Sequence, residues 1–303
     1  MHFKQILIVG VGLIGGSFGL AARRASLADR ITGYGGGRSL EKALSMGVID
    51  SIEESFDVGS VCQADLIYLA APVRGIIDFI VNRGSLIKPG AIITDAGSTK
   101  RDICRAARES LPNATRFVGG HPMAGSHFAG VQHASADLFS GAPYAIVVDD
   151  VSEPESGAFE QAVSTVEEIV RAIGARPVFI TAEGHDREVA RVSHVPQLLA
   201  IALARAVSNH AAGPAPVLAG RGLSGMTLLA ASEWTVWKDI CDTNRDEIID
   251  ALEELTGEID ILRGALGSGE YSYLGEAFED ANRFVRDLNE KISGGLGKRW
   301  PHM

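Results

Sequence analysis

The first twenty residues constrain the fold more than any other part of the chain. Residues 6–9 are all apolar, and they run into a turn with glycines at positions 10, 12 and 15. A buried strand, this spacing and a following helix are typical of a dinucleotide-binding βαβ unit, in which a diphosphate lies on the helix N-terminus. The residues that we expect around that diphosphate are Gly10, Gly12, Leu13, Ile14 and Gly15.

Largely apolar strands alternate with helical stretches over the first 181 residues. We expect helices over 14–26 and 39–46, and strands over 30–34, 64–71, 91–95, 117–118, 144–148 and 177–180. Strands that are apolar almost throughout predict a parallel sheet covered on both faces. We therefore predict an α/β fold, with a doubly wound Rossmann-type sheet in a domain spanning 1–181 and with the last two strands completing that sheet.

The character of the chain changes at residue 182, where strand signals end. Helical periodicity runs through 186–211, 222–242 and 244–265, which predicts an all-helical domain over 182–303. The runs 198–204 and 223–231 are too apolar for helices with a solvated face, so we predict a homodimer that buries both. The tail from Ser293 is expected to be loose.

Charge and cysteine content limit the partners. The chain has 303 residues and a net charge of −10, which argues against nucleic acid and anionic membranes because both attract basic surfaces. Its three cysteines lie far apart without metal-ligand spacing, as expected for reduced thiols in a cytoplasmic protein that binds no metal. No segment is long and apolar enough for a membrane span. A small anionic substrate would need local basic groups.

The end of the second strand bears on the choice of cofactor. An acidic residue there usually holds the ribose 2′-hydroxyl of NAD, but here the chain reads Gly-Gly-Gly-Arg from Gly35 to Arg38. Loss of the carboxylate and gain of a guanidinium favour NADP over NAD. The alternative is that Arg38 is a solvated loop charge and that backbone groups hold NAD.

Two histidines are candidates for chemistry. His121 lies in a Gly-Gly-His-Pro turn after a strand, and Ser98 follows another strand, both at the sheet edge where open α/β folds bind ligands. His194 precedes Pro196 inside a helical pattern, where the proline is expected to kink the helix. Each histidine could instead serve packing alone.

Taken together, the motifs resemble those of the prephenate and arogenate dehydrogenase family over nearly the whole chain. The motifs that carry the resemblance are the glycine turn, Ala70-Ala71-Pro72-Val73, Asp95-x-Gly97-Ser98-x-Lys100, Gly119-Gly120-His121-Pro122-Met123-Ala124-Gly125, Val192-Ser193-His194-Val195-Pro196 and the segment 237–244. The His-Pro-Met-Ala-Gly piece in this order with the others is highly specific.

The resemblance implies an NAD(P)-dependent oxidative decarboxylation in tyrosine biosynthesis. A ring carbinol loses hydride to the nicotinamide and carbon dioxide departs. By matching position, His121 accepts the hydroxyl proton, Ser98 orients His121, and His194 holds the substrate from the helical domain. Activity should then fall as His121 protonates in the usual histidine range. The resemblance places Gly35, Arg38, Ala71, Pro72 and Val73 around the cofactor.

Two positions depart from the family pattern. Leu228 stands where an arginine usually binds the ring carboxylate, and His127 stands where an acidic residue is common. Losing one partner of a buried ion pair costs about 2–5 kcal/mol, so another cation must serve or the substrate must differ. The residues that we expect to contact substrate are Ser126, His127, Arg191, Arg221 and Thr227, with the two arginines as replacement cations.

One alternative stays open, and two others are disfavoured by the residues present. Leu228 also fits a family member that dehydrogenates a different cyclic or hydroxy acid. A generic β-hydroxyacid dehydrogenase would need a lysine in the first helix of the second domain, and none lies between 182 and 212. A non-catalytic dinucleotide sensor would have no need of Ser98, His121 and His194.

Overall fold

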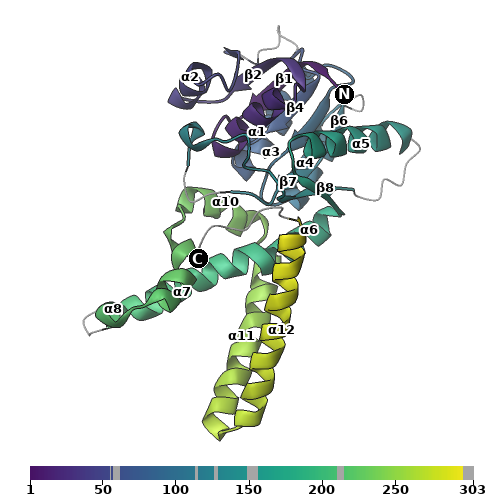
Figure 1. The fold of residues 1–303 in the computed structure, drawn as a ribbon. Helices are drawn as coiled ribbons and strands as arrows, with labels where there is room; N and C mark the ends of the chain where they lie inside the picture. The colour runs from purple at the N-terminus through teal and green to yellow at the C-terminus, as the bar shows by residue number, and fades with distance from the viewer. Residues whose placement is uncertain are drawn as a thin grey trace.

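A computed structural model describes residues 1–54, 56, 62–112, 115–125, 129–148, 156–209 and 215–295. At positions 38, 156, 215, 216 and 293–295 it describes the backbone alone. The chain up to Ile180 forms an α/β region, and helices project from one end of it as two arms (Figure 1). One arm contains α7 and α8, and the other is the hairpin of α11 and α12.

The main sheet has six strands, all parallel, in the order β3-β2-β1-β4-β5-β6. This order confirms the doubly wound Rossmann-type fold. Its strands are β1 (Phe3–Val9), β2 (Ala28–Tyr34), β3 (Ser51–Ile52), β4 (Leu66–Leu69), β5 (Ile92–Asp95) and β6 (Arg116–Val118). The helices between them are α1 (Leu13–Arg24), α2 (Arg38–Ser45), α3 (Val73–Arg83), the 3-10 turn η1 (Gly84–Leu86) and α4 (Arg101–Ser110).

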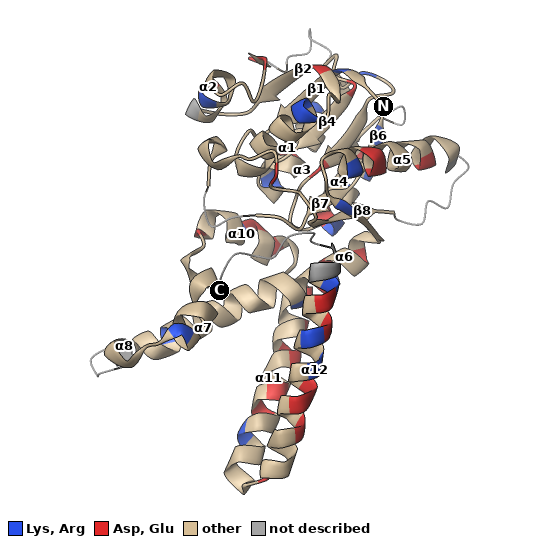
Figure 2. Ribbon diagram, in the orientation of Figure 1, with Lys and Arg blue, Asp and Glu red and all other residues tan. Residues whose placement is uncertain are grey.

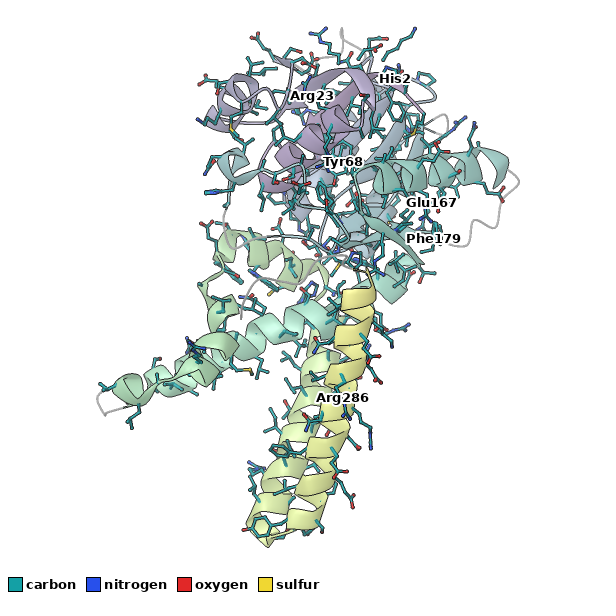
Figure 3. All side chains as sticks on the ribbon, viewed as in Figure 1. His2, Arg23, Tyr68, Glu167, Phe179 and Arg286 are labelled. Atoms are coloured by element: carbon teal, nitrogen blue, oxygen red, sulfur yellow. The ribbon has the colours of Figure 1, made fainter. Side chains whose placement is uncertain are left out.

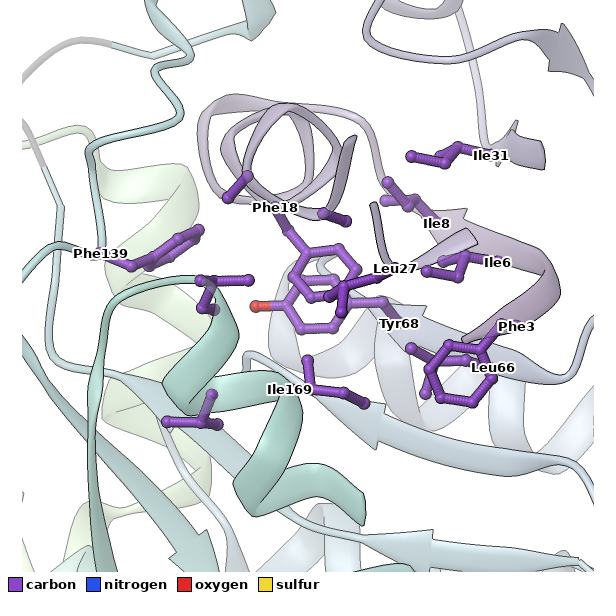
Figure 4. Packing of buried hydrophobic residues seen from close by; sticks show 14 of the residues in the cluster. Phe3, Ile6, Ile8, Phe18, Leu27, Ile31, Leu66, Tyr68, Phe139 and Ile169 are labelled. Atoms are coloured by element: carbon purple, nitrogen blue, oxygen red, sulfur yellow. The ribbon is translucent and has the colours of Figure 1, made fainter. Parts of the chain in front are cut away.

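The apolar β1 lies in the centre of the sheet because both of its faces are buried. Successive side chains of a strand point to opposite faces. Ile6 and Ile8 therefore join one core cluster, and Leu7 and Val9 join the other. In the first cluster the rings of Phe18 and Tyr68 stack with centroids 3.7 Å apart (Figure 4). Both clusters fix the position of the strand end from which the glycine turn starts.

A second, three-stranded sheet contains β7 (Gly120–Pro122), β8 (Pro143–Val147) and β9 (Arg176–Ile180). The 3-10 turn η2 (Val131–His133) and α5 (Ser156–Ala172) lie between these strands in sequence. The expectation that the last two strands complete the main sheet is therefore wrong. The main sheet ends at β6, and β7, which begins two residues later, pairs antiparallel with β8 instead.

The remaining described chain is helical, as expected, but the predicted stretches 186–211 and 222–242 are each divided into shorter helices, whereas the predicted 244–265 forms one helix from Arg245 to Ser268. They are α6 (Ala182–Val189), α7 (Val195–Ser208), α8 (Ala215–Leu218), α9 (Arg221–Met226), α10 (Trp234–Thr243), α11 (Arg245–Ser268) and α12 (Tyr271–Gly295). A π-helical turn, η3 (Ala190–His194), separates α6 from α7, and a 3-10 turn, η4 (Leu228–Ala231), separates α9 from α10.

The π turn confirms that the helical pattern is disturbed at Pro196. Proline has no amide hydrogen to donate to the preceding turn, so the helix rearranges there. The segment from Ser293 to Gly295, expected to be loose, continues α12, and the rest of that tail lies outside the described residues.

The helical region buries few apolar side chains within one chain. Its core cluster has five buried members, which are Ala190, Val195, Ile240, Ile248 and Ala251. By contrast, Phe278 and Phe284 on α12 are 71% and 64% exposed. Figure 2 shows α7 with hardly any charge on it, and Arg205 is its one charged residue. Among the described helices, none has the length and apolar character that a membrane span requires.

The α/β region and the helical region therefore differ in how far they bury their apolar side chains. In Figure 3, Tyr68 lies inside the α/β region, whereas Phe179 lies on edge strand β9 and Arg286 on the hairpin. Tyr68 is 1% exposed and Phe179 is 48% exposed. The α/β region thus has a closed core of its own, and the helical arms do not.

The glycine turn gives a stability prediction. A Cβ atom at Gly15 would overlap the carbonyl oxygen of Gly10, whereas a Cβ atom at Gly12 would meet nothing within 4 Å. We expect Gly15→Ala to lower the free energy of unfolding by about 1–3 kcal/mol, as overpacking does. Gly12→Ala is the matched control and should cost less than about 1 kcal/mol. Urea denaturation measures both, and equal stability of the two variants would contradict the prediction.

Candidate functional site

The turn after β1 leaves space in front of α1. Gly10 has a φ of +88° and donates its N–H to the carbonyl of Tyr34 at 2.9 Å. A Cβ there would lie 2.8 Å from the backbone of Ala70. Gly12, by contrast, has no neighbour within 4 Å of where its Cβ would be. Gly10 is therefore required by the protein's own packing, and Gly12 keeps a surface of the turn open.

The start of α1 has the properties of an anion site. Gly12 is its N-cap, no side chain caps the helix, and no acidic residue lies in its first turn. The first amides of the helix, including those of Leu13 and Ile14, therefore lack intrahelical acceptors, and the helix dipole favours a negative group there. Together with the open space at Gly12, these groups fit the diphosphate of a dinucleotide.

Neighbouring loops border the same turn. Gly35 lies beside it, because a Cβ at Gly35 would be 3.7 Å from the nitrogen of Gly10. On the other side β4 pairs with β1, and Ala71 and Pro72 lead from it into α3, which begins at Val73. These expected cofactor positions therefore lie together around the turn. Arg38 is the first residue of α2, but its side chain lies outside the described part of the structure.

A buried ion pair fixes the loop that follows β5. The carboxylate of Asp95 pairs with the ammonium of Lys100, and both side chains are fully buried. Asp95 also accepts the N–H of Gly97 at 2.8 Å and that of Gly120 at 3.0 Å. Lys100 donates to the carbonyl of Gly120 at 2.6 Å. This pair therefore ties the Ser98 loop to the strand that carries His121.

His121 is the first member of a hydrogen-bonded chain that crosses from β7 to α6. Its Nδ1 lies 2.9 Å from Nε2 of His185, and Nδ1 of His185 lies 2.8 Å from a carboxylate oxygen of Asp186. Asp186 also accepts the backbone N–H of Lys100 at 2.6 Å and that of Arg101 at 2.9 Å. Helix α6 begins one residue after Thr181, whose hydroxyl caps it by accepting the N–H of Gly184 at 3.0 Å.

Asn244 connects His194 to the same chain. Its amide nitrogen donates to the carbonyl of Asp186 at 2.7 Å and lies 3.2 Å from Nδ1 of His194. Its side-chain oxygen accepts from Arg101 at 3.2 Å. The ring of His194 is edge-on to Trp237, with centroids 5.8 Å apart. His194 is 1% exposed, so the structure places it inside the junction between α6, α10 and α11.

Burial makes all three histidines weak bases. It lowers the pKa of His121 well below the usual value, and repulsion from His185 when protonated, from Lys100 and from His194 when protonated lowers it further. Burial also lowers the pKa of His185, against the opposing effect of Asp186, and it lowers the pKa of His194 to about 4. This direction runs against the expectation that His121 titrates in the usual histidine range. At neutral pH its ring is uncharged and able to accept a proton.

Asp186 is the negative end of this chain. Burial raises its pKa, but hydrogen bonds from His185 and from the backbone of Lys100 and Arg101 outweigh that effect, so the pKa lies below its usual value. A single carboxylate thus stays ionised behind two neutral imidazoles.

The expected substrate residues are dispersed. Arg191 makes a two-pronged ion pair with Glu254 at 3.0 and 2.7 Å. Arg221 is exposed at the start of α9, and its side chain makes no ion pair with another described residue. The hydroxyl of Thr227 donates to the carbonyl of Leu223 at 2.8 Å. Leu228 is 67% exposed. Ser126 and His127 lie outside the described residues.

Ser98 lies in the loop that the buried ion pair fixes, and it is partly exposed. Its hydroxyl makes no hydrogen bond within the described ranges. The expected contact by which Ser98 orients His121 is therefore not seen, and Nδ1 of His121 lies against His185 instead. Over those same ranges no cluster of three or more His, Cys, Asp or Glu side chains is arranged to hold a metal ion.

His185 and Asp186 were not among the predicted site residues, and Asn244 was included only as the end of the segment 237–244. A signal was present, because a His-Asp pair stands at the start of the first helix after the last strand, nine and eight residues before His194. Their importance depends on contacts to β7 and α4, which sequence spacing does not reveal.

Comparison with known proteins assigns the family. Residues 18–179 match the family model of the prephenate dehydrogenase nucleotide-binding domain, and residues 181–280 match that of the prephenate dehydrogenase dimerization domain. Prephenate dehydrogenase of Bacillus subtilis is 33% identical over 96% of this chain and 78% of its own length. Cyclohexadienyl dehydrogenase of Zymomonas mobilis is 30% identical over 93% of this chain and 94% of its own.

A solved structure agrees with these matches. Prephenate dehydrogenase from Aquifex aeolicus, in complex with hydroxyphenyl propionate and NAD+, has a TM-score of 0.79 to this chain. The two are 25% identical, and the match covers 96% of this chain and 98% of the other. The chain therefore belongs to the prephenate dehydrogenase family of nicotinamide-dependent oxidoreductases.

Proposed function

We propose that the protein catalyses the oxidative decarboxylation of prephenate, arogenate or both, with His121 as the proton acceptor. The observation that carries the proposal is a neutral histidine at the carboxyl edge of the sheet, on a strand fixed by a buried ion pair. Relatives named for prephenate and cyclohexadienyl substrates support the substrate class. A non-catalytic dinucleotide sensor would not require a buried ion pair and two hydrogen-bonded side chains to position one imidazole.

The groups around the glycine turn would hold the cofactor. The amides at the start of α1 would bind its diphosphate, and Gly35 and the segment from Ala71 to Val73 would border it on either side. When bound, the nicotinamide supplies the two-electron acceptor for the substrate carbinol. Arg38 would bind a 2′-phosphate, which makes NADP the preferred form.

The role of the protein at the reacting carbon is to take a proton and to orient the ring. Nδ1 of His121 is occupied by His185, so its Nε2 is the nitrogen available to the substrate hydroxyl. Ser98 lies in the loop held beside that strand and would hydrogen-bond the same substrate oxygen. His194 would hold the substrate from the helical side. Departure of carbon dioxide leaves an aromatic ring, which drives the step forward.

A cation for the substrate carboxylate is also required. Arg191 is already neutralised by Glu254, whereas Arg221 has no ion pair among the described residues. Arg221 is therefore the better of the two candidates, with Thr227 following it by less than two turns.

We further propose that the protein is a homodimer through its helical domain. Apolar side chains left exposed on both arms need a cover, and a second copy would supply it by a symmetric contact. The family model matched by residues 181–280 is described as a dimerization domain, which supports this arrangement.

Turnover tests the proposed reaction directly. The purified protein should reduce NAD or NADP in the presence of prephenate or arogenate, measured as absorbance of the reduced nicotinamide. His121→Asn removes the proton acceptor and should lower kcat by about 10²–10⁴-fold. His2→Gln, on the exposed N-terminal histidine, is the control and should leave kcat unchanged. No turnover of either dienyl acid would reject the reaction.

The acidity of His121 gives a pH prediction. Because the base must be neutral, kcat/KM should fall as the pH drops through the pKa of His121 in the free enzyme. Burial places that pKa below 6.5, so the acid limb of the profile should have its midpoint below 6.5. Initial rates from pH 4.5 to 8 at low substrate measure it. A midpoint at or above 6.5 that disappears in His121→Asn would contradict the assignment.

Cofactor preference depends on Arg38. Arg38→Ala should raise the KM for NADP about tenfold or more and leave the KM for NAD unchanged, because a charge-assisted hydrogen bond to a phosphate is worth about 1.5–3 kcal/mol. Arg105→Ala, on an exposed arginine of α4, is the matched control. Equal changes for both cofactors would show that the guanidinium does not contact the 2′-phosphate.

A further inference from the structure

We infer that His185 and Asp186 are positioning residues that fix the protonation form of His121, leaving Nε2 as its bare, proton-accepting nitrogen. The inference deepens the proposed function and rests on it for the role of His121 in turnover. The hydrogen-bonded arrangement itself stands independently of any substrate. The three groups are Asp186, His185 and His121, and the protonation form of each determines that of the next.

The assignment starts from Asp186. Its side chain is fully buried and accepts N–H groups from the backbone of Lys100 and Arg101, so it is held as a carboxylate with no proton to donate. Nδ1 of His185 lies 2.8 Å from that carboxylate and must therefore carry the hydrogen.

The hydrogen positions on His185 and His121 follow because both rings are neutral. A neutral imidazole has one N–H, so Nε2 of His185 is an acceptor once Nδ1 is the donor. It lies 2.9 Å from Nδ1 of His121, which must then be the donor in that contact. His121 is neutral as well, and its single hydrogen is used on Nδ1. Its Nε2 is left with a free lone pair and makes no hydrogen bond to any described residue.

The same arrangement favours the product of proton uptake. Once Nε2 of His121 takes a proton, the ring is an imidazolium, and its Nδ1–H still points at an acceptor. The negative charge of Asp186 lies behind that acceptor and compensates part of the new positive charge. Without His185, neutral His121 would distribute its hydrogen between both nitrogens, and the ring would be free to turn about its χ2 angle.

His185 and Asp186 come from α6, whereas His121 comes from β7. Asp186 also fixes α6 against the start of α4 through Lys100 and Arg101. His121 therefore has its hydrogen on Nδ1 only when α6, the first helix of the helical domain, is packed against the α/β region. Figure 1 shows α6 at this junction, directly below β8.

Two substitutions at His185 separate positioning from packing. His185→Leu has similar volume and no acceptor, whereas His185→Gln places an amide oxygen near the site of Nε2 and so restores an acceptor for His121. We expect His185→Leu to lower kcat about 10²-fold, as misplacement of a catalytic group does, with KM values for cofactor and substrate within about threefold. His185→Gln should recover most of that loss.

The second readout is spectroscopic and needs no substrate. In the dimer labelled with 15N-histidine, the ring signals of His121, identified by their loss in His121→Asn, should report a hydrogen on Nδ1 and none on Nε2. His185→Gln should keep this form, and His185→Leu should show a mixture of both. His2→Gln is the control for labelling and stability, and thermal melting checks that each variant is folded.

The two readouts distinguish the possible failures. A native protein in which His121 carries its hydrogen on Nε2 overturns the inference, whatever its activity. So does a folded His185→Leu variant with native kcat and an unchanged His121 spectrum. If the spectra show the Nδ1–H form and neither dienyl acid is turned over, the positioning chain stands and the proposed substrate is rejected instead.

Discussion

The carboxylate of Asp186 is the contact on which the rest of the site depends. It is buried where α6 meets α4, and it accepts the backbone amides of Lys100 and Arg101. A buried charge is costly unless its hydrogen-bonding capacity is filled, and here backbone, guanidinium and imidazole donors fill it. The helical domain is thus anchored to the sheet through the group that also orders His185 and His121.

A second buried ion pair holds β7, the strand that carries His121. Lys100 pairs with Asp95, and both hold Gly120, the residue before His121. Adjacent residues of one loop therefore bind the two carboxylates: Lys100 through its side chain and backbone, and Arg101 through its backbone and guanidinium. Desolvation of the ring, together with the positive charge of Lys100, keeps His121 neutral, so the groups that position His121 also lower its proton affinity.

The α/β region and the helical arms differ in what stabilises them. The sheet is covered by two large apolar clusters, whereas the helical cluster is small and leaves aromatic side chains of α12 exposed. The sequence indicated this difference, since the runs 198–204 and 223–231 had no polar face. It overestimated helix continuity, because Pro196 induces a π turn and the chain leaves helical geometry before Trp234.

By itself the sequence determined the local features: the glycine turn, the parallel strands, the change to helices near residue 182 and the candidacy of His121. These depend on short-range periodicity and on backbone conformations that few residues adopt, such as the positive φ of Gly10. Only the tertiary structure decided that β7, β8 and β9 form a separate sheet, that Arg191 is paired with Glu254, and that His185 lies behind His121. Those facts depend on contacts between residues up to 64 positions apart, and no local pattern encodes which distant groups meet when the chain packs.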